Sequence, residues 1–523
     1  MLENNSALKS KIHQLYNKFQ GGGISDPLTA IEQITYLIFM KRLDSLDLKS
    51  MYEARIAGEK YNSKFDGEFK LPGTQQKVDK QTLRWSYFKK MSAEEMFSHI
   101  QMKVFPFLKT LDEAPFTYYM EDAVFIIPKS ALLAEAIATI DEIFDEIQKV
   151  ANKEGQDFQE IQGKVYEMLL FDTMKTGRNG QFKTPRHIIK LITELVEPQL
   201  GDRIADPACG TGGFLLGAYQ YIVTRQNKNK KDIQPDEDGF IRNTDRDVLT
   251  SEENEILNDS LYGYDANLTM VRLALMNLML HGVETPHIEY KNIMNTEFTV
   301  SNQYHIVMAN PPFGGVVSDD YINDSFRLKT KGIELLFLEV IYNSLKRGGT
   351  ASVIVSQGVL FGNSRANIEA RRLLIEECEL KAVINMPSGV YNPYSGLRTA
   401  ILIFTKGSET KNVWFYDMQE DGYSFDNRRR KLEGYGDLQD IVIEYKKRQR
   451  QESSERKGKF FSVPKKEIVE EEYNLSMDRY KQCVFEEIEY EKPVIILAKL
   501  KSVEDEIRRE LNVLEELLGE HAD

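Results

Sequence analysis

The sequence predicts an α/β protein with a doubly wound parallel sheet as its core, preceded by a helical N-terminal domain and followed by a helical C-terminal extension. Two features of the hydrophobic pattern predict this class. Between residues 158 and 406, short apolar segments typical of strands alternate with helical segments, the pattern of βαβ units. Outside that region, apolar residues recur at helical spacing. The expected strands are Arg203–Asp206, Leu261–Asp265, His287–Tyr290, His305–Ala309, Ala351–Ser356, Lys381–Asn385 and Thr399–Thr405.

The same pattern divides the chain into consecutive parts. Residues 1–150 are expected to form the helical N-terminal domain, and residues 151–406 the α/β domain. Residues 407–480 are polar and carry two basic clusters, so we expect a connecting region there. Residues 481–523 contain one long charged helix. Its apolar residues at heptad spacing fit either contact with another subunit or packing on its own domain.

Local signals support these assignments. Asp26 is a candidate N-cap and Pro27 a first helical residue, ahead of the apolar stretch Ile31–Met40. Lys129–Val150 also places apolar residues at helical spacing. Within the α/β domain, the charged segment Asn227–Asn254 is expected to be an exposed loop.

The composition is that of a globular protein. The 523 residues are 41% hydrophobic and 28% charged. Three cysteines rule out a disulfide scaffold and suit a reducing cytoplasm. The first residues show no secretory signal, and no apolar stretch reaches the ~18 residues of a membrane span. We therefore expect a cytoplasmic protein without membrane contact.

The charge is acidic, with 81 Asp and Glu against 67 Lys and Arg and a net charge of −14. This balance argues against a nonspecific nucleic-acid coat, whose affinity would come from cations that neutralise phosphates. It does not exclude a DNA enzyme that meets its substrate through a local patch or a partner.

The most informative stretch is Arg203–Leu216, which reads RIADPACGTGGFLL. A strand ends in Asp206, a turn containing Gly210, Thr211, Gly212 and Gly213 follows, and a helix begins. Glycines permit a tight turn and the close approach of a ligand. A plain strand–helix turn remains the structural alternative to a ligand site.

Three nucleotide sites compete for this turn. A phosphate-binding P-loop requires Gly-Lys-Ser/Thr, and no lysine is present. A dinucleotide site requires G-x-G-x-x-G, and the last glycine is missing. S-adenosylmethionine is a zwitterion without phosphate, and it needs an acidic strand end and glycines. The motif favours this third cofactor and resembles the cofactor loop of DNA amino-methyltransferases.

Two further residues are candidate cofactor ligands. Asp265 ends the next expected strand, where an acidic residue can accept hydrogen bonds from ribose hydroxyls. It could instead be the N-cap of a helix at Ala266–Leu280. Asn292 follows the third strand and could hydrogen-bond the cofactor adenine, although families with this fold often have Asp there.

The expected strand His305–Ala309 runs into Asn310, Pro311, Pro312 and Phe313. The prolines remove two N–H donors and leave carbonyl oxygens free. The Asn310 side-chain oxygen and the Pro311 carbonyl can accept both hydrogens of a planar adenine amine, so that its lone pair faces the methyl donor. Phe313 can stack on an extruded base, worth ~1–3 kcal/mol. A rigid turn that closes the strand is the structural alternative.

The cysteines and histidines support no competing chemistry. Methylation at cytosine carbon 5 needs a cysteine nucleophile, and this loop has none. Cys209 is interpreted as a small packing residue. Cys378, Cys483 and the histidines have no metal-ligand spacing, so no metal site is expected.

Together these motifs resemble the modification (HsdM-type) subunits of type I restriction–modification systems. Further segments share the resemblance: Ile31–Lys41, Gly180–Ile188, Leu273–Gly282 and Met386–Tyr391. It implies an S-adenosylmethionine-dependent, Rossmann-like methyltransferase that modifies adenine N6, because the cofactor loop precedes Asn-Pro-Pro-Phe. It also implies that the segment before the first strand lines the cofactor pocket. The residues concerned are Gln181, Phe182, Lys183, Thr184, Pro185 and Arg186, and many relatives carry an aromatic residue where Lys183 stands.

The resemblance also implies partners. A separate specificity subunit chooses the target in double-stranded DNA and binds two copies of this chain, and a restriction/translocase subunit joins for cleavage. In the C-terminal helix, Leu500, Ile507 and Leu514 recur every seven residues and form an apolar seam. The basic clusters Arg428–Lys431 and Lys446–Arg450 could contact DNA phosphates or form solvated faces.

Two alternatives remain open. Enzymes that methylate glutamine side chains in proteins also use Asn-Pro-Pro followed by an aromatic residue, because that amide is planar too. They are shorter and lack this helical N-terminus. A cofactor-binding scaffold without catalysis is the alternative from another class, and the intact Asn310 and Phe313 argue against it.

Overall fold

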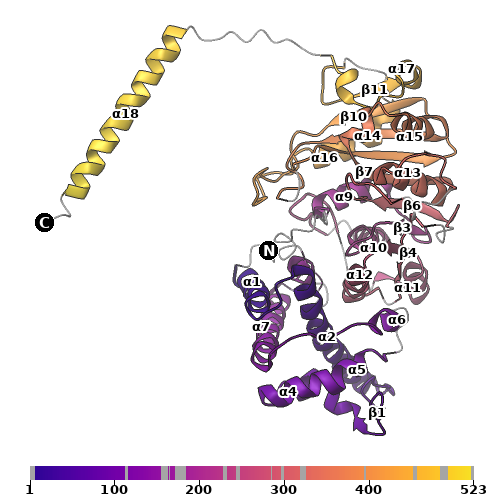
Figure 1. The fold of residues 1–523 in the computed structure, drawn as a ribbon, viewed down its shortest axis with the longest axis vertical. Coiled ribbons are helices and arrows are strands. Elements are labelled where there is room, and N and C mark those ends of the chain that lie inside the picture. Colours follow the sequence, from indigo (N-terminus) through magenta and orange to yellow (C-terminus); the bar gives the residue numbers. More distant parts are fainter. Residues whose placement is uncertain are drawn as a thin grey trace. The chain divides into compact units, whose positions relative to one another are not determined.

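The computed structural model describes residues 6–111, 116–154, 163, 165–170, 184–227, 233–242, 248–283, 285–295, 300–318, 325–393, 396–450, 456–482 and 493–519. The chain forms two compact units, Met1–Tyr480 and Lys481–Asp523. The first contains the N-terminal helices and the sheet (Figure 1). The second contains helix α18 (Pro493–Gly519), which confirms the predicted C-terminal helix.

The N-terminal residues fold into helices, as predicted. Helix α2 (Pro27–Ala57) begins at the expected position, where the Asp26 carboxylate accepts a hydrogen bond from the Thr29 backbone N–H at 2.8 Å. Helix α7 (Ser130–Glu154) covers the second expected run. The other elements are α1 (Ser6–Gly21), β1 (Glu68–Lys70), β2 (Lys77–Asp79), a 3₁₀ turn (Lys80–Leu83), α3 (Trp85–Phe88), α4 (Ala93–His99), a π-helical turn (Ile100–Val104), α5 (Phe105–Leu108) and α6 (Phe116–Met120).

In the described part of the chain, nine strands form one sheet in the order β11-β10-β8-β9-β7-β6-β3-β4-β5. Strand β9 runs antiparallel to β7 and β8, β11 runs antiparallel to β10, and the other pairs are parallel. All the predicted strands are confirmed. The bounds are β3 (Ile204–Asp206), β4 (Leu261–Asp265), β5 (His287–Tyr290), β6 (Tyr304–Ala309), β7 (Leu345–Ser356), β8 (Cys378–Met386), β9 (Thr399–Lys406), β10 (Asn412–Asp417) and β11 (Phe460–Pro464).

The sheet extends beyond residue 406, which corrects the expectation that residues 407–480 only connect two domains. Strand β10 pairs in parallel with β8, and β11 pairs with β10. Val413, Trp414, Phe415 and Tyr416 are all buried. Their burial on both faces of the sheet explains the pairing. The polar composition of residues 407–480, with both basic clusters between β10 and β11, obscured this short apolar run in the sequence.

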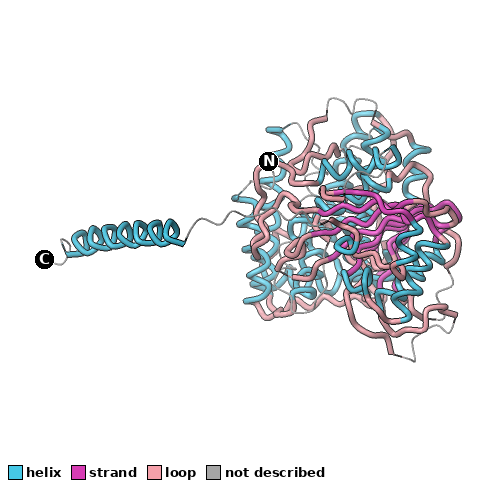
Figure 2. The backbone as a smooth tube through the Cα atoms, turned by 90° about the horizontal axis from the view of Figure 1, so that it is seen from above, coloured by secondary structure: helices cyan, strands magenta, loops and turns pink. Residues whose placement is uncertain are grey.

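Helices cover both faces of the sheet (Figure 2). Strand β6 shows the two layers, because Ile306 and Met308 belong to one hydrophobic cluster while Val307 and Ala309 belong to the other. The helices are α9 (Arg186–Val196), α10 (Gly213–Gln226), α11 (Ser251–Asn258), α12 (Leu268–Leu280), α13 (Ile333–Ser344), α14 (Gln357–Phe361), α15 (Arg365–Glu376), α16 (Leu438–Lys447) and α17 (Lys465–Glu470), with 3₁₀ turns at Arg448–Arg450 and Met477–Arg479.

Helix α11 corrects the expected loop Asn227–Asn254, because its first turn lies inside that segment. Thr250 caps the helix by accepting a hydrogen bond from the Glu253 backbone N–H at 3.2 Å, and the Glu253 carboxylate accepts one from the Thr250 N–H at 2.8 Å. The described residues 233–242 are irregular, as expected, but the segment is not fully exposed, because Asp238 and Phe240 are buried.

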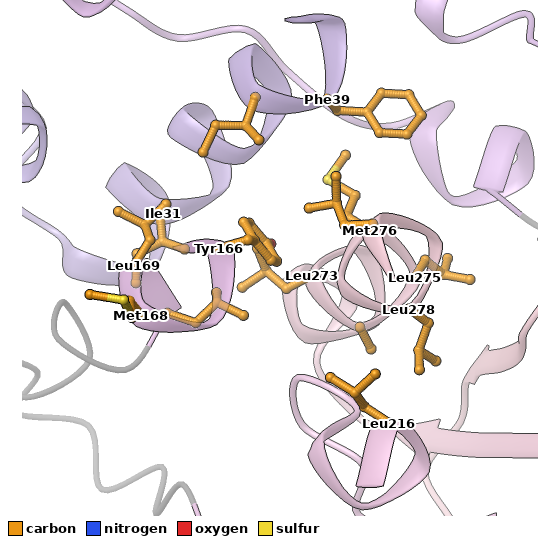
Figure 3. Close-up of a cluster of buried hydrophobic side chains, with 14 of the residues drawn as sticks. Ile31, Phe39, Tyr166, Met168, Leu169, Leu216, Leu273, Leu275, Met276 and Leu278 are labelled. Atoms are coloured by element: carbon orange, nitrogen blue, oxygen red, sulfur yellow. The ribbon is translucent and has the colours of Figure 1, made fainter. Parts of the chain in front are cut away.

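The N-terminal helices share a core with the sheet domain. Figure 3 shows Leu273 and Met276 of α12 between Phe39 of α2 and Leu216 of α10. A buried ion pair adds to this contact, with Arg272 Nη1 2.9 Å from Glu32 Oε1. The helices of residues 6–154 therefore pack directly on the layer that carries the glycine loop. No helix within the described ranges is long and apolar enough to cross a membrane.

Candidate active site

The carboxyl ends of β3, β4 and β6 meet at one edge of the sheet, and a predicted site residue stands at each. Strand β3 ends at Asp206, β4 ends at Asp265, and Asn310 follows β6. Strand β3 lies between β4 and β6, so the strand order reverses around it. Such a switch point is where doubly wound sheets bind ligands.

The loop from β3 to α10 has a conformation that requires glycine. Gly210 and Gly212 have φ values of 53° and 77°, in the left-handed region. The Gly210 backbone N–H donates to Asp265 Oδ2 at 3.0 Å. A Cβ on Gly213 would lie 3.0 Å from Ile189 Cδ1, so the helix that follows packs closely on α9. The predicted turn is thus tied to the next strand and to its neighbouring helix.

Asp206 is an acid in a buried position. Its side chain is 1% exposed, and its Oδ1 accepts a hydrogen bond from the Ala208 N–H at 3.0 Å. Burial raises the pKa of Asp206 to about 8, and the nearby Asp265 charge contributes to this rise. At neutral pH the carboxyl therefore holds a proton, and a cation bound beside it would favour its release.

Asp265 is not the helix cap that the sequence left open as an alternative. Helix α12 is capped by Asn267, whose Oδ1 accepts from the backbone N–H groups of Thr269 and Met270 at 2.9 and 3.2 Å. Asp265 instead joins two loops, because its oxygens accept from the N–H groups of Gly210 and Asn267 at 3.0 and 2.8 Å. Burial raises the pKa of Asp265.

Two neighbours of the glycine loop are structural. The Thr211 carbonyl accepts a hydrogen bond from Asn277 Nδ2 at 2.8 Å, which holds the loop on α12. In the sequence, the segment around Asn277 carried only a family resemblance, which did not predict its bond to Thr211. Cys209 is 4% exposed, and burial raises the pKa of its thiol. This confirms the interpretation of Cys209 as a packing residue.

Asn292 lies at the same edge of the sheet, beyond β5. Its side chain is exposed, and its Oδ1 accepts a hydrogen bond from the Met294 N–H at 3.0 Å. That bond shapes the turn in its own loop. In the role predicted for Asn292, its side-chain nitrogen would be the group that hydrogen-bonds the cofactor adenine.

Asn310 holds the most distinctive polar atom of the site. Its Nδ2 donates to Thr184 Oγ1 at 3.0 Å. Its Oδ1 is buried and has no hydrogen-bond partner among the described residues. A buried acceptor without a partner costs about 1–3 kcal/mol. With Nδ2 bonded to Thr184, Oδ1 is the free acceptor of the Asn310 amide, and the sequence predicts that this atom binds an amine.

The rest of the Asn-Pro-Pro-Phe loop is partly open. Pro311 is buried, Pro312 is exposed and Phe313 is half-buried. The Phe313 ring meets Tyr391 edge to face, with centroids 5.8 Å apart. Tyr391 belongs to the loop between β8 and β9, so that loop forms a wall beside Phe313.

Glu334 is a site residue that sequence reasoning missed. Its Oε2 accepts from the Gly314 N–H at 3.1 Å and its Oε1 from the Ser356 N–H at 2.9 Å. It therefore ties the residue after Phe313 to the end of β7. An isolated glutamate at a helix start carries no local signal for this role.

Only part of the segment before α9 can be placed. Gln181, Phe182 and Lys183 lie outside the described residues. Pro185 precedes the first residue of α9, Arg186, whose guanidinium pairs with Glu167 at 2.9 Å. The structure thus brings Thr184 to Asn310, while the Arg186 charge is engaged with another helix.

Comparison with known proteins agrees with this geometry. The N-6 DNA Methylase family matches residues 157–489, and the HsdM N-terminal domain matches residues 8–140. The chain is 29% identical over 412 residues to the EcoEI methylase subunit of a type I restriction enzyme from Escherichia coli, covering 76% of this chain and 74% of that protein. It is 30% identical over 335 residues to the StySJI methylase subunit of Salmonella typhimurium, covering 61% of this chain and 59% of that protein.

Solved structures show the same fold. A chain from a study of the assembly and conformational transition of a type I restriction–modification system is 25% identical, with a TM-score of 0.65 and 99% of each chain covered. The type I methyltransferase subunit from Streptococcus thermophilus has a TM-score of 0.65 at 17% identity, covering 90% of this chain and 98% of that one.

The fold and the family match define a DNA methyltransferase. The chain belongs to the N-6 DNA methylase family and carries the HsdM N-terminal domain. The resemblance to HsdM-type modification subunits is therefore confirmed, and the protein-glutamine alternative is not supported.

The Thr184–Asn310 contact can be tested by methyl transfer to DNA. We predict that Thr184→Val lowers kcat about tenfold, because the Asn310 amide loses the bond that orients it. Thr184→Ser keeps the hydroxyl and should retain kcat. Steady-state kinetics separate this role from cofactor binding. An unchanged kcat with a raised KM for the cofactor in Thr184→Val would show that Thr184 serves the cofactor instead.

Proposed function

We propose that the chain transfers a methyl group from S-adenosylmethionine to adenine N6 in DNA through the Asn310 site, as the modification subunit of a type I restriction–modification complex. The observation that carries this proposal is the buried Asn310 Oδ1 atom, which has no partner among the described residues. An amine hydrogen is the natural donor for such an acceptor.

The residues at the edge of the sheet fit the cofactor. The glycine loop carries no lysine that would favour a phosphate ligand, and the two carboxyl groups of Asp206 and Asp265 suit a cationic amino acid joined to a ribose. When bound, S-adenosylmethionine supplies an electrophilic methyl group. The chain supplies the pocket. In it, the Asp206 carboxyl would lie beside the positive charge of the cofactor, and Asp265 holds the loop by accepting the hydrogen bond from the Gly210 N–H.

The Asn310 loop acts on the base. The Asn310 Oδ1 atom and the Pro311 carbonyl accept one hydrogen each from the adenine amine, which draws the nitrogen toward tetrahedral geometry and exposes its lone pair. Phe313, which is half-buried and meets Tyr391 edge to face, is the proposed stacking surface for an extruded base. A strong general base is not required before transfer, because the proton on the nitrogen becomes acidic only as the new bond forms, and it is then released to water.

The target sequence comes from a separate specificity subunit in this proposal. Two copies of the chain bind one specificity subunit, and a restriction subunit joins for cleavage. Helix α18 is the proposed contact. Leu500, Ile507 and Leu514 recur every seven residues and are 63%, 54% and 56% exposed. An apolar seam of this kind is typical of helices that pair with another helix.

The catalytic role of Asn310 predicts a loss of methyl transfer with cofactor binding intact. In Asn310→Ala, transfer should fall by about 10²-fold or more, because one group that stabilises the reacting amine is lost. Labelled methyl transfer, with chromatography of the digested DNA, measures both the rate and the product. N4-methylcytosine as the wild-type product, or normal transfer by Asn310→Ala, would contradict the proposal.

The raised pKa of Asp206 predicts a pH dependence of cofactor binding. The free carboxyl holds its proton up to about pH 8, and a bound cation favours the ionised form. A proton must therefore leave on binding, so the cofactor Kd should rise as pH falls from 8 to 6, by up to about tenfold per unit. Calorimetry should find this slope removed in Asp206→Asn. A flat wild-type Kd over that range would refute the role of Asp206.

The apolar seam of α18 predicts where the specificity subunit binds. Replacing Leu500, Ile507 and Leu514 together by Gln keeps helix propensity and should weaken association at least about tenfold. The control, Ser502→Gln with Arg509→Gln, changes the opposite side of the helix. Light scattering of the co-purified complex measures assembly. Wild-type assembly by the seam variant would exclude α18 as the contact.

A further inference from the structure

The two basic clusters beyond residue 425 differ in their surroundings. In the second cluster, Lys446 pairs with Glu197 at 3.0 Å, Lys447 pairs with Glu444 at 2.7 Å, and the Arg448 guanidinium lies 3.8 Å from the Tyr445 ring centroid. Internal contacts of the protein therefore account for these cations.

The second cluster also lies at the edge of the sheet away from Asn310. Lys446 lines a pocket with Thr350 of β7. Thr350 pairs with Ile306 at the start of the parallel β6–β7 ladder, whereas Asn310 follows the end of β6. At ~3.3 Å per residue, the two edges are more than ~10 Å apart.

The first cluster belongs to a hairpin formed by Gly422–Leu432, here named the arginine hairpin. The Ser424 N–H donates to the Arg430 carbonyl at 2.8 Å, and the Leu432 N–H donates to the Gly422 carbonyl at 2.9 Å. A turn from Asp426 to Arg429 reverses the chain. The hairpin follows β10, which runs parallel to β8, so it leaves the sheet at the Asn310 edge.

The arginine hairpin contacts residues on two sides of the Asn310 site, next to Thr184 and next to Tyr391. On one side, Asp421 at its base pairs with His187 at 2.9 Å, three residues after Thr184. On the other side, the Phe425 carbonyl accepts from Asn392 Nδ2 at 2.6 Å, beside the Tyr391 that meets Phe313. These contacts fix the hairpin next to the base site.

The four cations of the hairpin divide into two pairs. Arg429 is 6% exposed and pairs with Asp421, and Lys431 lies 3.6 Å from the Asp238 carboxylate. Arg428 and Arg430 are exposed, and neither guanidinium makes a hydrogen bond or an ion pair within the described residues. Hydrogen bonds from the Arg428 backbone N–H and the Ser424 hydroxyl lower the pKa of Asp426, and the Arg430 charge adds a smaller contribution.

We propose that Arg428 and Arg430 bind the phosphate backbone of duplex DNA beside the extruded target base. Guanidinium groups match phosphate geometry, and such contacts position the duplex without reading its sequence. In a chain with a net charge of −14, two arginines that acidic side chains leave unpaired next to the site give DNA a local anchor. This inference rests on the proposed function, because it takes DNA as the substrate of the Asn310 site.

The test compares two charge-matched variants in the complex of the full chain with its specificity subunit. Anisotropy of a labelled target duplex between about 50 and 300 mM salt gives the slope of log K against log [salt]. Arg428→Gln with Arg430→Gln should reduce this slope by about 1.8, which is 0.9 for each of two phosphates. Lys446→Gln with Lys447→Gln removes the same charge at the other edge and should leave the slope unchanged.

Further measurements separate a phosphate contact from other roles. The hairpin variant should lower the affinity for target and non-target duplexes by the same factor, and it should leave the cofactor Kd unchanged. Arg428→Lys with Arg430→Lys should restore the slope. An unchanged slope, an equal loss in both glutamine variants, or failure of the hairpin variant to assemble with the specificity subunit would each overturn the proposal. If the wild-type complex does not methylate DNA, the proposed function fails instead.

Discussion

In the structure, Asn310 Nδ2 donates a hydrogen bond to Thr184 Oγ1, which leaves Oδ1 as the unpaired end of the Asn310 amide. An amide can present a donor or an acceptor, and only an acceptor suits the hydrogens of an amine. Because Thr184 occupies the nitrogen, Oδ1 is left buried and without a partner among the described residues. An unpaired buried acceptor costs about 1–3 kcal/mol, and in the proposed mechanism the adenine amine supplies its missing donor.

The sheet brings the parts of the site to this bond. Parallel pairing of β3 with β4 and β6 aligns Asp206, Asp265 and Asn310 at one edge, and the left-handed turn at Gly210 links the first two. Strand β10 extends the sheet, and the arginine hairpin that follows it lies at the same edge. Asp421 and the Phe425 carbonyl hold the hairpin there through His187 and Asn392. The acidity of the chain is thus compatible with DNA binding, because Arg428 and Arg430 are exposed beside the site and have no ion pair among the described residues.

The sequence predicted most of the sheet and the loops with strong local patterns. Strands β10 and β11 were missed because each is a short apolar run in a polar region, and both basic clusters lie between them. Thr184 was predicted, through a family resemblance, to line the cofactor pocket, and its bond to Asn310 joins residues far apart in the chain. Glu334 had no local signal either, because its bond to Gly314 also joins residues that are distant in the chain. Contacts that depend on tertiary placement are not encoded in the spacing of neighbouring residues.

The most direct measurement is a crystal structure of the complex with S-adenosylhomocysteine and a target duplex. The predicted result is an adenine swung out of the duplex, with its N6 within hydrogen-bond distance of Asn310 Oδ1, about 2.7–3.2 Å. Thr184 Oγ1 should remain on Nδ2 of the same amide. A base that stays stacked, or an Asn310 amide whose oxygen faces Thr184 while the base lies elsewhere, would contradict the account.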